Sequence, residues 1–298
     1  MNLRESEKYI VEQLQQIYDT REASSIADIL IENISGLSRV DRLAKNNIDL
    51  NTEQTNLLND ILTRLLKHEP IQYMIHKAWF YNLELYVDNS VLIPRPETEE
   101  LVDWLYNDIK DSGLKIFNHR EKKADETSTL KIADIGTGSG CIALALKKLI
   151  PGAEVWGFDI SDEALNVARR NGSHLDIRVD FQAVNFLDIS QQKYLPTVDV
   201  VVTNPPYVPL SDKDLMKDNV VKYEPHIALF VPDNDPLIFY KALIHFSRHR
   251  IHENGKMYME IHEDLANQVI NLLESEGYKS VELKKDMQGK NRMVKVLI

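Results

Sequence analysis

The first 70 residues place apolar side chains three and four positions apart, which is the spacing of one face of an α-helix. A second stretch with this spacing begins at Asn51 or Thr52. It ends before Pro70, because a proline disfavours the helical conformation of the residue that precedes it. The clearest run of such positions consists of Ile26, Ile29, Leu30 and Ile34. The pattern predicts a small all-α bundle over residues 1–75.

Short extended runs replace the helical spacing between residues 76 and 94, where Asp88 and Asn89 are turn-forming residues. We therefore expect a β-hairpin linker over residues 76–94, followed by a larger domain over residues 95–298. Helical spacing returns over residues 97–111. The polar stretch FNHREKKADETSTL that follows predicts a mobile surface loop.

Strand-like and helix-like segments alternate after residue 130. The runs typical of strands are LKIADIG, AEVWGFD, VNFLD, VDVVVTN and GKMYMEI. Alternation of this kind predicts an α/β domain in which helices cover both faces of a mostly parallel sheet. The last two strand-like runs, YKSVELKKD and RMVKVLI, are close enough in sequence to form an antiparallel hairpin.

Composition narrows the class of protein. The chain has 298 residues, 43% of them hydrophobic, which is enough for two domains with separate cores. Its net charge of −11 disfavours binding to nucleic acids or membrane surfaces. A single cysteine, Cys141, excludes an internal disulfide and fits a reducing compartment. Because the chain begins without a signal-type apolar run and contains no apolar stretch of about 20 residues, we expect a cytoplasmic protein.

A glycine-rich turn, DIGTGSG, follows the first of these strand-like runs and opens the next helix. It differs from the dinucleotide fingerprint GxGxxG and lacks the lysine of a phosphate-binding loop. Its alternate glycines let the backbone approach a ligand, although they can also serve only strand and helix packing. Asp159 ends the next strand-like run, where its carboxylate can accept hydrogen bonds from both hydroxyls of a ribose. A nucleoside without phosphates, such as S-adenosylmethionine, fits this pattern.

The predicted cofactor residues follow the ends of four strand-like runs. After the third run, Asn185 and Phe186 would border the adenine, and Asp188 would fix the loop or serve only as a helix cap or turn former. The full predicted cofactor set is Asp134, Gly136, Thr137, Gly138, Gly140, Asp159, Ile160, Asn185, Phe186 and Asn204.

The run VDVVVTN ends in the sequence NPPY, at the sheet edge where ligands bind in open α/β folds. Prolines lack an N–H donor and fix the backbone, so this turn presents outward carbonyls. The side-chain oxygen of Asn204 and the carbonyl of Pro205 can each accept an N–H from a planar amide nitrogen, while Tyr207 stacks on its flat face. The alternative is a proline-terminated strand with an asparagine turn. We predict Asn204, Pro205 and Tyr207 as catalytic residues.

With these motifs the chain resembles the HemK/PrmC family, the glutamine N(5)-methyltransferases that modify peptide chain release factors. The resemblance rests on EPIQYMIHKAWFYNLELYVDNSVLIPRPETEELVDW, IADIGTGSGCIALALKK, GFDISDEAL, VVTNPPYVP and YEPHIAL. It covers most of the chain, and VLIPRPETEELV is highly specific to this family, whereas NPPY also occurs in amino-methyltransferases that act on DNA bases.

The resemblance implies a class I S-adenosylmethionine-dependent methyltransferase. The implied fold is Rossmann-like, with a mostly parallel seven-stranded sheet and an antiparallel C-terminal hairpin, preceded by a small all-α substrate-recognition bundle. The implied cofactor is S-adenosylmethionine, and the implied acceptor is the glutamine of a Gly-Gly-Gln motif in class I peptide chain release factors. We further expect a monomer without direct nucleic-acid or membrane partners.

The stretch IPRPETE is expected near the acceptor site. Arg95 would pair with Glu97 or Glu99 to hold the linker, and Thr98 or Glu97 would cap the following helix. The predicted substrate-binding residues are Asn204, Pro205, Pro206, Tyr207, Arg95 and Glu97.

Two stretches depart from the family pattern. FVPDNDPLIFY replaces a glycine-rich loop, so the sequence leaves the conformation of residues 230–237 open. His262 stands where a glycine is usual and is expected to start a helix or lie at the surface. The histidines are scattered without ligand spacing, so no metal site is predicted.

Three other functions stay open at this point. A sister family with the same NPPY methylates a glutamine of a ribosomal protein. A DNA adenine amino-methyltransferase would share the planar nitrogen, but the acidic balance of this chain opposes phosphate binding. A binding module that has lost catalysis would use the cofactor pocket as a sensor.

Overall fold

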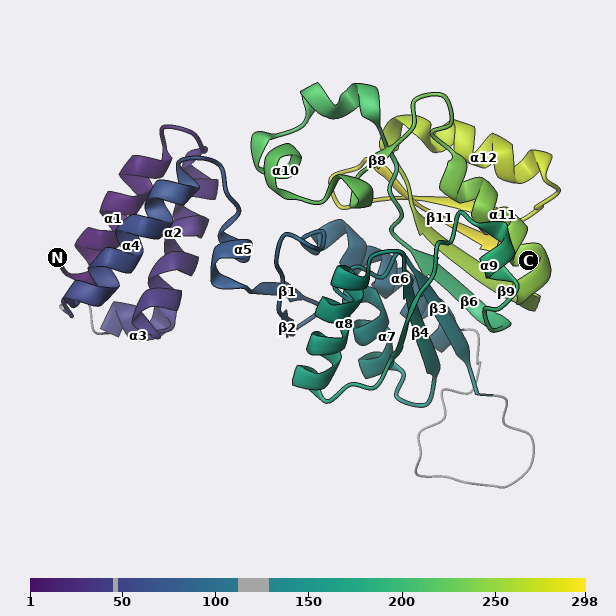
Figure 1. The fold of residues 1–298 in the computed structure, drawn as a ribbon, viewed down its shortest axis with the longest axis horizontal. Coiled ribbons are helices and arrows are strands. Elements are labelled where there is room, and N and C mark those ends of the chain that lie inside the picture. Colours follow the sequence, from purple (N-terminus) through teal and green to yellow (C-terminus); the bar gives the residue numbers. More distant parts are fainter. Residues whose placement is uncertain (45–47, 112–128) are drawn as a thin grey trace. The chain divides into compact units, whose positions relative to one another are not determined.

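The computed structural model describes residues 1–44, 48–111 and 129–298. Contacts divide the chain into two compact units, and most of the polar stretch predicted as a mobile loop lies outside the described residues (Figure 1). The helical unit comprises Met1–His76 and Lys217–Tyr223; the sheet unit comprises Lys77–Met216 and Glu224–Ile298.

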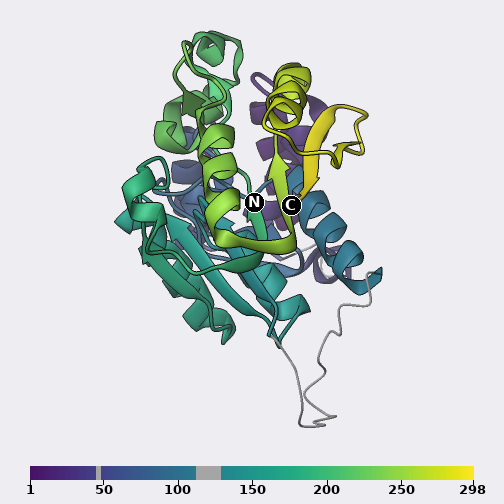
Figure 2. The same ribbon diagram turned by 90° about the vertical axis from the view of Figure 1, so that its right-hand side faces the viewer.

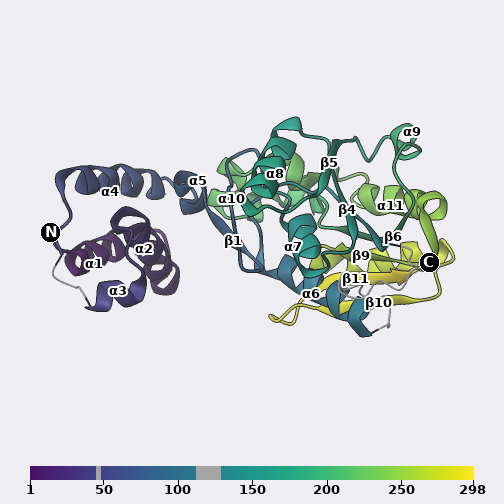
Figure 3. The same cartoon turned by 90° about the horizontal axis from the view of Figure 1, so that it is seen from below.

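The helical unit is built from amphipathic helices, the first of which are seen in Figure 3. These helices bury their apolar faces together, with Leu14, Leu30 and Leu58 fully buried. Asn51 caps its helix in a capping box with Gln54, which confirms the predicted helix start. The helices described in this unit are α1 (Leu3–Leu14), α2 (Thr20–Ser35), α3 (Arg39–Ala44), α4 (Thr52–Leu65), α5 (Ile71–Ile75) and α10 (Asp218–Tyr223).

Helix α10 belongs to the helical unit although it follows the NPPY turn in sequence. The ammonium of Lys217, just before α10, lies 3.2 Å from the carboxylate of Glu22. The hydroxyl of Tyr223 donates to the carbonyl oxygen of Lys67 at 3.0 Å. No sequence signal had placed this segment with the first 76 residues, because its partners are distant in sequence.

The sheet unit contains a seven-stranded sheet in the order β10-β11-β9-β6-β3-β4-β5. The strands β3, β4, β5, β6 and β9 pair in parallel, whereas β11 runs antiparallel to β9 and β10. These pairings confirm the predicted sheet and C-terminal hairpin, whose strands are yellow in Figure 2. The strands are β3 (Lys131–Ile135), β4 (Glu154–Asp159), β5 (Asp180–Ala183), β6 (Val198–Thr203), β9 (Ile251–Glu260), β10 (Val281–Lys285) and β11 (Asn291–Leu297).

Helices cover both faces of the sheet, as the alternating pattern predicted. One core cluster joins the sheet to α6, α7 and α8, and a second joins it to α11 and α12. The helices are α6 (Pro96–Asp111), α7 (Cys141–Leu149), α8 (Asp162–Leu175), α9 (Ile189–Gln192), α11 (Ile238–Arg250) and α12 (Ala266–Ser275). No described helix is long and apolar enough to cross a bilayer.

The linker forms the predicted hairpin. Its strands are β1 (Ala78–Phe80) and β2 (Leu83–Leu85), and they are joined at Tyr81 and Asn82, which both have positive φ. Asp88 forms a later turn, where its carboxylate accepts from the N–H of Ser90. The predicted turn at Asp88 and Asn89 is therefore present, but it follows the hairpin and does not join its strands.

The stretch whose conformation the sequence left open begins as a strand. Phe230–Val231 form β8, which pairs in parallel with β7 (Val208–Pro209) directly after the NPPY turn. The N–H of Asp235 then donates to the carbonyl of Pro232 at 3.0 Å, which turns the chain toward α11. The pairing of β8 with β7 therefore fixes the residues that directly follow the NPPY turn.

A buried side chain ties the linker to the glycine turn. Asn171 of α8 accepts from the N–H of Tyr86 at 2.7 Å and donates to the carbonyls of Tyr86 and Ser139 at 3.0 and 2.9 Å. The side chain is fully buried, so these bonds are shielded from water.

We predict that Asn171→Leu lowers the free energy of unfolding of the sheet unit by about 3 kcal/mol, because it removes three buried hydrogen bonds. Urea unfolding followed by tryptophan fluorescence measures this, since Trp79, Trp104 and Trp156 all lie in the sheet unit. The exposed Asn166 of the same helix provides the control, Asn166→Leu. Equal losses for the two variants would contradict the assigned role.

Candidate functional site

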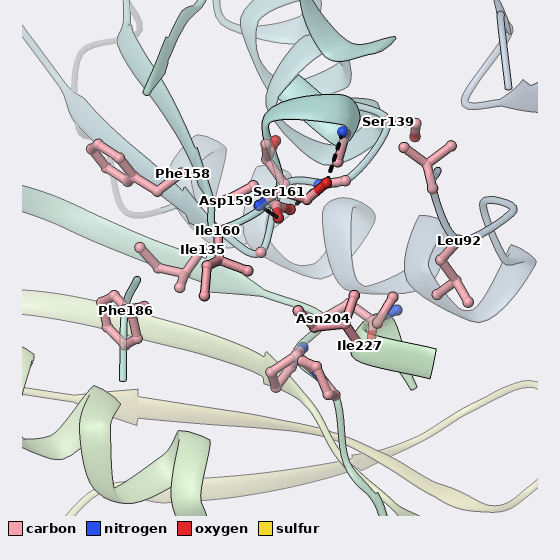
Figure 4. Close-up of a pocket in the computed structure, with 18 of the residues that line it drawn as sticks. Leu92, Ile135, Ser139, Phe158, Asp159, Ile160, Ser161, Phe186, Asn204 and Ile227 are labelled. Carbon is pink, nitrogen blue, oxygen red and sulfur yellow. Dashed lines mark hydrogen bonds between the residues drawn. The ribbon is translucent and has the colours of Figure 1, made fainter. Parts of the chain in front are cut away.

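A cavity of about 210 Å³ lies in the sheet unit at the carboxyl ends of β3, β4 and β6. Figure 4 shows Asp159, Ile160 and Asn204 around it, with Leu92 of the linker on another side. The cavity is lined by eight of the predicted cofactor residues: Gly136, Thr137, Gly138, Asp159, Ile160, Asn185, Phe186 and Asn204. Asp134 and Gly140, which were also predicted, lie behind this lining.

The glycine turn presents bare backbone to the cavity. Gly136 and Gly138 have φ of 70° and 53°, in the left-handed region that side chains other than glycine rarely adopt. A Cβ at either position would meet no protein atom within 4 Å. It would extend into space that the cavity otherwise leaves for a ligand.

Gly140 serves packing instead. A Cβ there would lie 3.0 Å from the ring of Phe181 and 3.2 Å from the Cβ of Ala168. The packing alternative that we considered for the glycine turn therefore applies to Gly140, while the two glycines before it border the cavity.

Asp134 stabilises the glycine turn through buried hydrogen bonds. Its fully buried carboxylate accepts from the hydroxyl of Thr137 at 2.7 Å and from the N–H of Ala143 at 3.2 Å. Its other oxygen, Oδ1, has no hydrogen-bond partner among the described residues. Burial raises the pKa of Asp134 to about 7, because the charged form is poorly solvated there.

Asp159 lies at the end of β4 and is hydrogen-bonded to the glycine turn. Its carboxylate accepts from the N–H of Gly138 at 2.9 Å and from the N–H of Ser161 at 3.0 Å. Burial raises the pKa of Asp159, while these backbone bonds oppose the rise. A carboxylate has about four acceptor positions, so Asp159 retains capacity for two further donors.

The loop after β5 lies on a third side. Asp188 caps α9 by accepting from the N–H of Ser190 at 2.9 Å and does not line the cavity, which corresponds to the helix-cap alternative. Asn185 uses its side-chain oxygen to accept from the N–H of Leu187 at 3.2 Å. The ring of Phe186 packs against Phe246, so this residue contributes a firm apolar wall.

The NPPY turn follows β6 as predicted, and its first three residues line the cavity. The side-chain amide of Asn204 donates to the hydroxyl of Thr98 at 3.0 Å. The hydroxyl of Tyr207 donates to the buried carboxylate of Glu260 at 2.9 Å, and its ring meets His262 edge to face. Tyr207 therefore lies behind the cavity wall, so the stacking role predicted for it stays a prediction.

Two expectations for IPRPETE were wrong. Arg95 pairs with Glu224 of the YEPHIAL stretch at 2.6 Å, instead of Glu97 or Glu99, and it lines the cavity. Thr98 does not cap α6, because its hydroxyl donates to Glu260 at 2.7 Å.

Glu97 lies outside the lining, where its carboxylate accepts from Gln288 at 3.0 Å. His262 does start a short helix as expected, since its ring nitrogen accepts from the N–H of Asp264. Among the described residues no group of three possible ligands gathers around a metal position.

Sequence reasoning missed two residues of the site. Thr98 looked like a helix cap, and Glu260 was overlooked at the end of the strand-like run GKMYMEI. An acidic residue between Met259 and Ile261, at the carboxyl end of a buried strand, was a usable signal, because isolated charges are rarely buried without a purpose.

Comparisons with known proteins cover both units. Residues 7–75 match the family model of the PrmC N-terminal domain, and residues 126–295 match a methyltransferase domain. The release factor glutamine methyltransferase of Flavobacterium psychrophilum is 39% identical over 96% of this chain and 95% of its own length. That of Bacteroides thetaiotaomicron is 37% identical over 96% of each chain.

Solved structures share the fold at low sequence identity. The hMettl16 catalytic domain matches with a TM-score of 0.54 and 16% identity, covering 85% of this chain and 84% of that one. This likeness concerns the methyltransferase fold alone.

We predict that Asp134→Asn changes how stability depends on pH. In wild type the unfolded chain ionises Asp134 above about pH 4, while the folded protein keeps the proton until about pH 7. Relative to the variant, wild type should therefore lose up to roughly 4 kcal/mol of stability as the pH rises through this window, and no more above it. Urea unfolding of both ligand-free proteins from about pH 4 to about pH 8 measures the difference. A constant difference would contradict the assignment.

Proposed function

The chain belongs to the family of release factor glutamine methyltransferases, and from this premise we propose that it methylates the glutamine of the Gly-Gly-Gln motif in class I peptide chain release factors. It is an S-adenosylmethionine-dependent methyltransferase, as its resemblance to the family predicted. The observation that carries the proposal is the position of Asn204, which lines the same cavity as the glycine turn and Asp159.

The residues of the cavity suit S-adenosylmethionine, which when bound supplies a methyl group on a positively charged sulfonium. Asp159 has acceptor capacity for the two ribose hydroxyls. Ile160 and Phe186 offer apolar surface to the adenine. The bare backbone at Gly136 and Gly138 leaves room for the methionine portion.

Charge also favours this ligand. The carboxylates of Asp134 and Asp159 lie on the two sides of the glycine turn, and Asp134 keeps one oxygen without a partner among the described residues. A cationic ligand would favour the ionised form of both groups. The same charges would repel the pyrophosphate of a dinucleotide.

For the acceptor we propose a planar amide nitrogen held by two oxygens. The side-chain oxygen of Asn204 and the carbonyl of Pro205 would each accept one of its N–H groups, which orients the nitrogen toward the methyl group. An amide nitrogen is a weak nucleophile, and positive charge develops on it during transfer. Fixed dipoles beside it therefore contribute more than a strong base would.

We also propose that the protein acts in the cytoplasm as a monomer, without nucleic acid or membrane as direct partners. The net charge of −11 supports the absence of nucleic acid and anionic membrane surfaces as partners, since it opposes phosphate binding. A ribosomal-protein glutamine and an adenine base remain the competing acceptors.

The acceptor is tested by incubating purified protein with methyl-labelled S-adenosylmethionine and a class I release factor. We expect one methyl group on the Gly-Gly-Gln glutamine, located by mass spectrometry of the peptide. A release factor with alanine at that glutamine is the control. Absence of label, or preferential labelling of ribosomal proteins or plasmid DNA in competition, would refute the proposal.

We predict that Asn204→Ala lowers kcat about a hundredfold or more, because one of the two oxygens that orient and stabilise the acceptor nitrogen is lost. The affinity for S-adenosylmethionine, measured by isothermal titration calorimetry, should stay within a few fold. Unchanged turnover would rule out the role of Asn204.

A further inference from the structure

A buried carboxylate lies behind the proposed acceptor site. Glu260, at the carboxyl end of β9, has 1% of its surface exposed. One of its oxygens accepts from the hydroxyl of Thr98 at 2.7 Å and the other from the hydroxyl of Tyr207 at 2.9 Å. Thr98, which is 2% exposed, in turn accepts from the side-chain amide of Asn204 at 3.0 Å. The chain of bonds therefore runs from Asn204 through Thr98 to Glu260.

The direction of these bonds follows from the chemistry of each group. An ionised carboxylate only accepts hydrogen bonds, and a hydroxyl has a single proton to donate. Because Thr98 gives this proton to Glu260, it can offer only a lone pair to Asn204. Asn204 must then approach Thr98 with its NH₂ group, and its side-chain oxygen is left for the cavity that it lines.

We propose that Glu260 and Thr98 are positioning residues that fix the amide of Asn204 with its oxygen toward the acceptor nitrogen. This inference rests on the proposed function. The two ends of an asparagine amide have nearly the same shape, so packing alone does not distinguish them. A reversed amide would direct an N–H donor at the N–H groups of the acceptor glutamine and would oppose binding in the reactive orientation.

Opposing effects act on the protonation of Glu260. Burial raises the pKa of Glu260, while the bonds from Thr98 and Tyr207 and the charge of Arg292 favour the ionised form. The bond from Thr98 survives protonation of the other oxygen, because the oxygen that Thr98 contacts would still accept.

The kinetic test compares Thr98→Val with Thr98→Ser. Valine keeps the shape of threonine and removes both bonds, whereas serine keeps the hydroxyl. We expect kcat to fall about tenfold or more for Thr98→Val and to stay within about threefold of wild type for Thr98→Ser. The affinity for S-adenosylmethionine should change in neither. Equal kcat for the two variants, whether high or low, would overturn the inference.

A second measurement reports the orientation of the amide directly. A release factor with glutamate in place of the acceptor glutamine presents carboxylate oxygens, which the oxygen of Asn204 should repel in wild type. A freed amide can turn its NH₂ group toward that carboxylate. We therefore expect this release factor to inhibit Thr98→Val and Glu260→Leu, which both remove the Thr98–Glu260 bond, at least about fivefold more tightly than wild type. Equal inhibition of all three proteins would overturn the inference, and a merely destabilised fold would not tighten binding.

The experiments separate this inference from the proposed function. If wild type fails to methylate the release factor, the proposed function fails. If wild type methylates it and the variants show neither change, only the positioning role fails. Circular dichroism and calorimetric binding of S-adenosylmethionine confirm that each variant is folded before it is scored.

Discussion

Parallel pairing of β6 with β3 and with β9 is the constraint on which the site depends. Because these strands run in the same direction, their carboxyl ends meet at one edge of the sheet. The glycine turn, the NPPY turn and Glu260 follow or end these three strands, which are far apart in sequence. The hydroxyl of Thr203 strengthens the arrangement, since it donates to the carbonyl of Ile135 at 2.7 Å across the two strands.

Two buried carboxylates stabilise this edge in different ways. Asp134 accepts from the glycine turn and from α7, and it keeps one oxygen without a partner among the described residues. Glu260 has both oxygens engaged by hydroxyl groups from other elements. A buried charge is costly unless it is bonded, so each carboxylate constrains the groups around it. In the function that we propose, the first shapes the cofactor side of the cavity, and the second determines how Asn204 faces the acceptor.

The motifs that identify the family are joined by tertiary contacts. Arg95 of IPRPETE and Glu224 of YEPHIAL form an ion pair in which the carboxylate side chain is 1% exposed. Glu224 also accepts from the N–H of Ile93 at 3.2 Å, so one acidic side chain holds the linker in two places. Asn171 does the same for the hairpin and the glycine turn. These links give stretches without catalytic chemistry a structural role in this chain.

The sequence by itself determined the helical bundle, the order in which strands and helices follow one another along the chain, and the turns after β3 and β6. These features depend on periodicity, on glycine and proline geometry and on local capping, which are properties of neighbouring residues. Only the tertiary structure decided that Arg95 pairs with Glu224, that Lys217–Tyr223 join the helical unit and that Thr98 links Asn204 to Glu260. Partners in these contacts are separated by more than a hundred residues, so no local pattern specifies them, and they meet only in the folded chain.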